Sequence, residues 1–390
     1  MNHDSRNPLI SIGPRVRKSP YFEATLRYGA EAFTIYNHVY MPTSYGDDVR
    51  DYWSLVNDVT LWDVSCQRQV QVSGPDAYKL IEFLTPRDMS GCEVGQCQYI
   101  VLTDEAGGIV NDAVMLRIEE NMYWISPGDG DVLWWVKGIA VNSGMDVTII
   151  EPDVSPLQLQ GPKAPFVAYD LFGDWALELP YYRLQETTLD GIPLVVSRTG
   201  WSGELCYEIY LRDGQYGDQL WERIMQAGKK YKIAPTSPST IRSIEGGLLS
   251  YCSDITLNDS PFTIGMGKFV HFDRAGDFIG QQALRQISEE GPQRLLVGIE
   301  IDGEPIEGND AFWGLQKDGQ QTGHVTRCVY SPRLKKNIGW ANVPAEQSAI
   351  GTTLTMLAPV DTRQATVCEA PWIESQIRIP DEIREQVRNT

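Results

Sequence analysis

Two acidic side chains stand inside runs that otherwise have the apolar character of β-strands. Asp112 lies in IVNDAV, and Glu208 lies in CYEIYL, just after the glycine-containing turn TGWSGE. Burying a carboxylate is costly unless a partner compensates it, so an acid in such a position usually has a partner or a role in chemistry. We therefore take Asp112 and Glu208 as the first candidates for a functional site.

Glu208 can be read in two ways. Strand alternation sends Glu208 and Tyr210 to one face, opposite the core residues Tyr207 and Ile209. That face could be a solvated outer surface, which is common for Glu. It could also line a cavity, where an ionised carboxylate would accept hydrogen bonds from adjacent ring N–H and amino groups, the pattern that a pterin presents.

Asp112 alternates with Val110 and Val114, which predicts that its side chain faces inward. Tyr99 lies on the preceding strand-like run and could share a pocket wall with Asp112. Trp201 and Tyr210, close to Glu208 in the sequence, could supply flat walls or electron-rich faces for a cationic ligand. Ordinary core packing is the alternative for each of these aromatic residues.

The overall charge excludes several classes of partner. The 390 residues include 33 Lys and Arg against 52 Asp and Glu, a formal net charge of −19. Nucleic acids and anionic membranes require a cationic footprint, so we expect neither as a partner and favour a small-molecule ligand. The sequence shows no signal-peptide pattern and no run of about 18 apolar residues, which predicts a cytoplasmic protein.

Metal binding is not predicted. The seven cysteines contain no Cys-x-x-Cys pair, and with only four histidines no zinc-ligand spacing emerges. We interpret the cysteines as reduced and mostly structural.

The elements that would position these residues form an internal duplication. The segments 70–84 and 157–172 both alternate over four residues, turn at Gly-Pro and continue with helical spacing. The segment 98–128 reads as an antiparallel meander. We therefore predict an α+β fold in which residues 20–285 form two similar halves with antiparallel sheets.

The C-terminal part has a different pattern. From residue 290 to 376, short strand-like runs separated by turns predict a small β-barrel domain, and 377–390 would be a tail. Five helices are predicted before the barrel, at 76–84, 131–142, 163–172, 218–228 and 238–251.

Several motifs, in this order along nearly the whole chain, resemble the tetrahydrofolate-dependent aminomethyltransferase superfamily, also known as the glycine-cleavage T-protein superfamily. Within it, YNHVYMP, WDVSCQRQV, TPRDMS and IEGGLLSY are most similar to its dimethylsulfoniopropionate demethylase branch. The motifs that carry the resemblance to the superfamily are WDVSCQRQVQVSGPDA, LTDEAGGIVNDAV, LQGPKA, SRTGWSGELCYEI, IEGGLLSYCSDIT and SPRLKKNIGWANV.

This resemblance implies a folate-binding core and a tetrahydrofolate-dependent methyltransferase that demethylates a small methylated cation, with dimethylsulfoniopropionate as the expected donor. Asp112 matches the family acid that lies against the reactive part of folate and would orient it and receive or relay a proton. Glu208 matches the acid that holds the pterin, and Tyr99 matches an aromatic residue of the folate pocket. In the demethylase branch, the residues that wall the substrate pocket match Phe22, Tyr36, Trp201 and Tyr210.

The chain departs from the demethylase pattern at two places. Residues 203–206 read Gly-Glu-Leu-Cys, which is more similar to the aminomethyltransferases. Ser243 stands where both branches usually have Arg, and Arg242 would point about 100° away around a helix. For the carboxylate of a zwitterionic donor, Arg198, Arg242 and Lys268 are the candidates.

The alternatives from the resemblance stay open. The donor could be a betaine, an N-methyl amino acid or a methoxylated compound, and the glycine-cleavage reaction would require a lipoyl carrier protein. A non-catalytic folate-binding protein of the iron–sulfur maintenance type shares the fold, but its Lys-Gly-Cys-Tyr-x-Gly-Gln-Glu signature is missing from this sequence. A homodimer also stays open.

Overall fold

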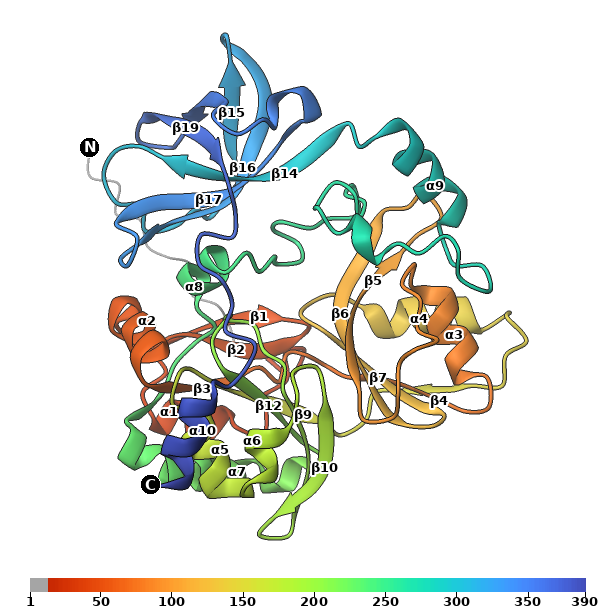
Figure 1. Ribbon diagram of the computed structural model, residues 1–390, viewed down its shortest axis with the longest axis vertical. Coiled ribbons are helices and arrows are strands. Elements are labelled where there is room, and N and C mark those ends of the chain that lie inside the picture. The colour runs from red at the N-terminus through yellow and green to blue at the C-terminus, as the bar shows by residue number, and fades with distance from the viewer. Residues whose placement is uncertain (1–12) are drawn as a thin grey trace.

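The computed structural model describes residues 13–390 and consists of two sheet-and-helix halves and a barrel (Figure 1). The first half has a five-stranded sheet in the order β5-β6-β7-β4-β8, in which every pairing is antiparallel. Its strands are β4 (Val70–Ser73), β5 (Cys97–Thr103), β6 (Ile109–Glu119), β7 (Met122–Pro127) and β8 (Thr148–Ile150). The helices α3 (Ala77–Leu84) and α4 (Val132–Ala140) complete this half, and the predicted meander is confirmed.

The second half has a six-stranded sheet in the order β10-β11-β12-β9-β3-β13. Its strands are β3 (Val59–Asp63), β9 (Ser155–Gln160), β10 (Leu184–Leu189), β11 (Ile192–Ser197), β12 (Cys206–Leu211) and β13 (Ile233–Pro235). Its helices are α5 (Ala164–Phe172), α6 (Trp175–Glu178) and α7 (Gly217–Gly228). The order β5-β6-β7-β4 in the first sheet corresponds to β10-β11-β12-β9 in the second, which confirms the predicted duplication.

One glycine in each half shows why the repeated Gly-Pro turn is required. Gly74, between β4 and α3, has φ +128°, and Gly161, between β9 and α5, has φ +121°. A Cβ on Gly74 would lie 2.5 Å from the carbonyl oxygen of Asp146, and one on Gly161 would lie 2.6 Å from that of Asp58. Both turns therefore need glycine for its backbone conformation and for the close approach of a neighbouring chain segment.

The C-terminal domain is a closed barrel in the order β14-β17-β16-β15-β18-β19, as predicted. Its apolar interior includes Ile299, Leu315 and Val325, which are all fully buried. The barrel strands are β14 (Arg294–Ile301), β15 (Trp313–Lys317), β16 (Gln320–Ser331), β17 (Lys336–Pro344), β18 (Thr353–Leu357) and β19 (Thr362–Cys368). The helix α9 (Gln281–Glu290) precedes the barrel and lies beside the first half in Figure 1.

The N-terminal elements lie along the second half. They are α1 (Phe22–Arg27), the hairpin of β1 (Ala32–Tyr36) and β2 (Val39–Ser44), and α2 (Asp48–Asn57). Short 3₁₀ helices occur at Gly214–Tyr216, Lys229–Tyr231, Gly267–Phe269 and Ala345–Gln347.

One predicted helix was too long. The helix expected at 238–251 is α8, which covers only Thr240–Glu245, and its N-cap is Ser239. It ends because Gly246 and Gly247 follow, and Gly247 has φ +73°, a left-handed conformation that terminates helices. Leu248 and Tyr251, which lie within the predicted range 238–251, therefore belong to a loop and not to the helix.

Buried charges on α8 join the units. Glu245 is fully buried and accepts hydrogen bonds from Tyr52 of α2 at 2.8 Å, Ser331 of β16 at 2.5 Å and Arg333 of the next turn at 3.0 Å. Arg242, on the same helix, donates from Nε to Glu204 at 2.6 Å. These contacts hold α8 between the second half and the barrel.

The last residues do more than form a loose tail. The helix α10 (Asp381–Arg388) packs against α5, and Ile379 and Val387 are buried. Arg388 bridges to Asp174 and Glu178 on the second half. The chain therefore returns from the barrel to the second half.

Replacing Gly161 with Ala should destabilise the protein by roughly 1–3 kcal/mol, because the new Cβ would meet backbone oxygens in a left-handed region. Gly138→Ala is the matched control, since Gly138 lies in α4 with nothing within 4 Å of a new Cβ, and this change should stabilise slightly. Thermal or denaturant unfolding measures both. Equal stabilities for the two variants would contradict the account of the repeated turn.

Candidate functional site

The candidate site is a cavity of about 1760 Å³ where the two halves and the barrel meet. Asp112 of β6 and Glu208 of β12 both line it, so the structure brings the two predicted acids to one hollow. The other elements that contribute are the β1-β2 hairpin, α2, the loop 247–253, the barrel loop 305–312 and the strand β16.

Asp112 and Tyr99 form a hydrogen-bonded pair on adjacent strands. The Tyr99 hydroxyl donates to Asp112 Oδ2 at 2.9 Å. Burial raises the pKa of the Asp112 carboxyl to about 6, the hydrogen bond from Tyr99 opposes this rise, and the negative charge of Asp254 adds to it. Val114, two residues along β6, shares the cavity-lining face with Asp112. This arrangement produces a carboxylate that can hold a proton near neutral pH.

Glu208 has a fuller set of partners. Its Oε1 accepts from Gln158 at 2.6 Å, and its Oε2 accepts from Thr199 and, at 3.1 Å, from Tyr210. The side chain is only 3 % exposed, and burial raises its pKa although the three hydrogen bonds act in the opposite direction. A carboxylate has about four acceptor positions, so one remains for a ligand.

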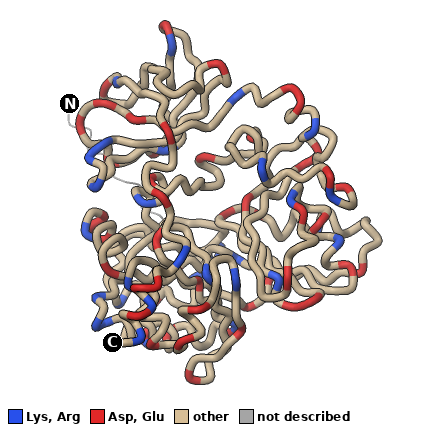
Figure 2. Tube along the Cα trace, viewed as in Figure 1, with Lys and Arg blue, Asp and Glu red and all other residues tan. Residues whose placement is uncertain are grey.

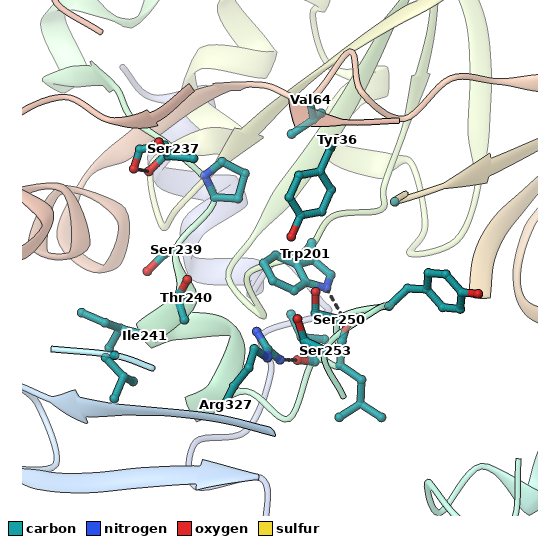
Figure 3. A pocket seen from close by; sticks show the side chains of 18 of the residues that line it. Tyr36, Val64, Trp201, Ser237, Ser239, Thr240, Ile241, Ser250, Ser253 and Arg327 are labelled. Atoms are coloured by element: carbon teal, nitrogen blue, oxygen red, sulfur yellow. Dashed lines mark hydrogen bonds between the residues drawn. The ribbon is translucent and has the colours of Figure 1, made fainter. Parts of the chain in front are cut away.

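Two of the four predicted substrate aromatics line the cavity. Tyr36 lies at the end of β1 and Trp201 in the turn before β12, and Figure 3 shows both rings in the same hollow. The Trp201 indole donates from Nε1 to the carbonyl oxygen of Leu249 at 3.2 Å. That bond fixes the ring plane against the loop 247–253.

The other two, Phe22 and Tyr210, are not part of the lining. Phe22 is 5 % exposed and its ring packs against Phe33 at 5.0 Å and Tyr40 at 5.6 Å between centroids. Tyr210 is fully buried beside Trp124, and it contacts the site through its hydrogen bond to Glu208. Alternation gave the correct face of β12, but it could not show that other side chains cover Tyr210.

Sequence reasoning missed Arg327, which is the only basic side chain among the described residues that line the cavity. Arg327 lies on barrel strand β16, where the register against β17 skips Thr326. Such a bulge re-aims a neighbouring side chain, and here the arginine joins the cavity wall. A single arginine within a barrel strand gives no local signal, so only the pairing register could have identified it.

Arg327 also contacts Ser243, the position at which the family usually has an arginine. Its Nη1 donates to Ser243 Oγ at 3.1 Å, so a guanidinium from the barrel contacts the helix position at which the departure from the family occurs. Of the three basic residues considered earlier, none lines the cavity. Arg242 pairs with Glu204, and Arg198 donates to the carbonyl oxygen of Cys206 at 2.9 Å.

The cavity is acidic. Figure 2 shows acidic and basic residues spread over all parts of the molecule, but the charged residues that line the cavity are mostly acids. Within residues 13–390, the acidic lining residues are Asp47, Asp48, Asp51, Asp112, Asp129, Glu208, Glu307 and Asp310, and the basic one is Arg327. This lining favours a cationic or hydrogen-bond-donating occupant.

The residues present fit the reduced pterin that the sequence resemblance implies. Glu208 has one acceptor position left for an N–H donor, and Asp112 Oδ1 accepts no side-chain hydrogen bond within residues 13–390. Tyr99 lines the same wall and contacts Phe269, with ring centroids 5.8 Å apart. The volume is ample for a folate and a small second ligand together.

None of the helices formed by residues 13–390 is both long and apolar enough to cross a membrane. Within the same residues, no cluster of three or more His, Cys, Asp or Glu side chains has the geometry of a metal site.

Comparisons with known proteins agree with this geometry. The family model of the GCVT N-terminal domain matches residues 21–274, and that of the glycine cleavage T-protein C-terminal barrel domain matches residues 294–374. The dimethylsulfoniopropionate demethylase of Ruegeria pomeroyi is 37% identical over 366 residues, which cover 93% of this chain and 100% of the relative.

An aminomethyltransferase of Symbiobacterium thermophilum is 32% identical and covers 93% of this chain and 99% of its own. The crystal structure of the glycine cleavage system aminomethyltransferase T from Bartonella henselae superimposes with a TM-score of 0.85 at 22% identity, over 93% of this chain and 99% of that one. The chain belongs to the glycine cleavage T-protein family and is an enzyme of one-carbon transfer that uses tetrahydrofolate as the acceptor.

Proposed function

We propose that this enzyme demethylates a small methylated cation, with dimethylsulfoniopropionate as the donor, and produces 5-methyltetrahydrofolate. The observation that carries the proposal is the convergence of Asp112, Glu208 and aromatic walls on one acidic cavity. Support for the donor comes from the 37% identity to a dimethylsulfoniopropionate demethylase over its full length. The acidic lining supports a donor that carries a positive charge.

In this proposal, bound tetrahydrofolate supplies the nucleophilic nitrogen that accepts the methyl group. Asp112 orients the folate through Oδ1, to which no described side chain donates, and holds the proton that leaves this nitrogen, a task suited to a pKa of about 6. Tyr99 fixes the other oxygen, Oδ2, and thereby the carboxyl orientation. Glu208 holds the pterin through its remaining acceptor position.

The aromatic residues have separate tasks. Tyr36 and Trp201 line the cavity and present ring faces, which attract a methylated cation without forming an ion pair that must later break. Phe22 and Tyr210 act from behind the wall, Phe22 through packing against the aromatic rings of Phe33 and Tyr40, and Tyr210 through Glu208. Closure of this lining around both ligands would hold donor and acceptor in line and exclude water.

Aminomethyl transfer is the second candidate, because several relatives of similar coverage are named aminomethyltransferases. The sequence resemblance also likened Gly-Glu-Leu-Cys at residues 203–206 to that branch. We also propose a cytoplasmic location, since all seven cysteines are unpaired, as is usual for proteins of reducing compartments. A homodimer stays compatible with both candidates.

A donor panel tests the proposed function directly. Purified protein is incubated with tetrahydrofolate and one of four donors labelled in the methyl group: dimethylsulfoniopropionate, glycine betaine, an N-methyl amino acid and a methoxylated aromatic. We expect labelled 5-methyltetrahydrofolate with dimethylsulfoniopropionate at the highest kcat/KM. Turnover that requires a lipoyl carrier protein would favour aminomethyl transfer, and no methyl transfer from any donor would refute the proposal.

The Asp112→Asn variant should lose activity and gain stability. We expect kcat to fall by roughly 10²–10⁴-fold, the usual contribution of a positioned acid–base group. The folded-state pKa of about 6 exceeds the ordinary aspartate pKa of 3.8, so the folded protein takes up a proton as the pH falls through this range. The cost of the ionised carboxylate is therefore absent below about pH 4 and complete above about pH 6.

Removing that charge should raise the free energy of unfolding at pH 7.5 by roughly 1–3 kcal/mol. Denaturant unfolding at pH 7.5 measures the gain. A variant that keeps full activity, or that is less stable than the wild type, would contradict the role given to Asp112.

The pH dependence of kcat/KM should report the titration of the Asp112 carboxyl. Below about pH 6, protonated Asp112 can no longer accept a proton, so the rate should fall about tenfold per pH unit. The residual activity of Asp112→Asn is the control and should lack this acid limb. A limb of the same midpoint in both proteins would assign it elsewhere, with Glu208 as the next candidate because burial also raises its pKa.

A further inference from the structure

A second group of polar side chains lies in the cavity, apart from the Asp112 and Glu208 pair. It consists of Arg327 and the hydroxyls of Ser250 and Ser253, and Figure 3 shows all three near Trp201. The Arg327 guanidinium carbon lies 5.7 Å from the Trp201 ring centroid. Ser250 and Ser253 belong to the loop 247–253, which contributes to the cavity lining.

The partners of Arg327 fix its guanidinium in place. Its Nε donates to Asp254 Oδ2 at 2.7 Å, its Nη2 donates to the carbonyl oxygen of Leu248 at 2.7 Å and contacts Asp254, and its Nη1 donates to Ser243. The Arg327 side chain is 11% exposed and that of Asp254 is fully buried. A guanidinium has five N–H groups, so these contacts leave one N–H on Nη1 for a ligand.

This position is unusual in an acidic cavity. Eight lining carboxylates would repel an anion, and Arg327 is the one described side chain of the lining that offsets them. Asp254 compensates part of the positive charge of Arg327. The attraction of an anion to this place therefore depends on directed N–H and O–H donors as much as on net charge. Two serine hydroxyls beside a fixed guanidinium provide such donors for a carboxylate.

We infer that Arg327, with Ser250 and Ser253, binds the carboxylate of a zwitterionic methyl donor. The inference rests on the proposed function and narrows it to donors in which a carboxylate and a methylated cation are a few bonds apart. Trp201 borders both subsites, since it lines the cavity beside Tyr36 and also lies against the Arg327 guanidinium. The cation would lie on the aromatic faces while the carboxylate reaches Arg327.

A purely structural role for Arg327 is the rival explanation, because Arg327 holds the loop 247–254 through Leu248 and Asp254. A structural role would weaken the binding of every ligand of the cavity in equal measure. A carboxylate anchor instead discriminates between two donors that differ only at their anionic end. The test therefore compares matched ligands and does not depend on a loss of affinity alone.

The experiment measures equilibrium binding of dimethylsulfoniopropionate and of its amide to the full chain by titration calorimetry. The amide has the same cation and nearly the same shape but no negative charge. We expect the wild type to bind the carboxylate at least tenfold more tightly than the amide. In Arg327→Gln the ratio should fall to about one, through weaker binding of the carboxylate with little change for the amide.

Two further variants distinguish the loss of the carboxylate anchor from a loss of folding. Arg327→Gln leaves the buried Asp254 carboxylate unpaired, which is destabilising, so the double variant Asp254→Asn with Arg327→Gln removes both charges of the pair. It should fold and also bind both ligands alike. Arg363→Gln is the matched control, since Arg363 pairs with Asp361 on the barrel and is not part of the cavity lining. It should keep the wild-type ratio.

The inference is overturned if the wild type binds the amide as tightly as the acid, if it binds neither, or if the preference survives in both Arg327 variants. Methyl transfer from the same two donors separates this result from the proposed function. Selective binding of the carboxylate without any methyl transfer would remove the proposed reaction and leave the anchor. Methyl transfer from both donors at equal KM would leave the proposed reaction and remove the carboxylate anchor.

Discussion

The rest of the structure depends on one constraint: two carboxylates, Asp112 and Glu208, are withdrawn from bulk water into the same cavity. The two differ in the number of hydrogen bonds that they accept. Glu208 accepts three hydrogen bonds from side chains, whereas Asp112 accepts a single side-chain hydrogen bond, from Tyr99. A well-satisfied carboxylate is suited to binding, and a poorly satisfied one with a raised pKa is suited to proton transfer.

The two duplicated halves each contribute one acid of the pair Asp112 and Glu208, but from positions that are not equivalent. In the shared strand order, β6 of the first half corresponds to β11 of the second, and β12 corresponds to β7. Asp112 lies on β6 and Glu208 on β12, so the two acids come from strands that are not equivalent. The repeat provides two similar frames, and each frame contributes a different residue to the cavity. The barrel then adds the third wall, including Arg327.

Local patterns in the sequence predicted what depends on local physics. The repeated Gly-Pro turns, the meander and the inward core face of β12 follow from backbone conformation and from alternation, which act over a few residues. The end of α8 was misjudged because the apolar spacing continued past Gly246 and Gly247. The layer in which Phe22 and Tyr210 lie depends on what packs over them, and the direction of Arg327 depends on a bulge in the barrel register. Neither the depth of these two aromatic residues nor the direction of the Arg327 side chain can be predicted from the residues next to them in the sequence.

The central claim is that a reduced pterin binds between Asp112 and Glu208. A crystal structure of the protein in complex with a stable reduced folate tests this claim most directly. The account predicts the pteridine ring in the cavity, with Glu208 accepting from a ring N–H or amino group and the Asp112 carboxyl beside the nitrogen that receives the methyl group. A pteridine bound elsewhere, or one that contacts neither acid, would contradict it.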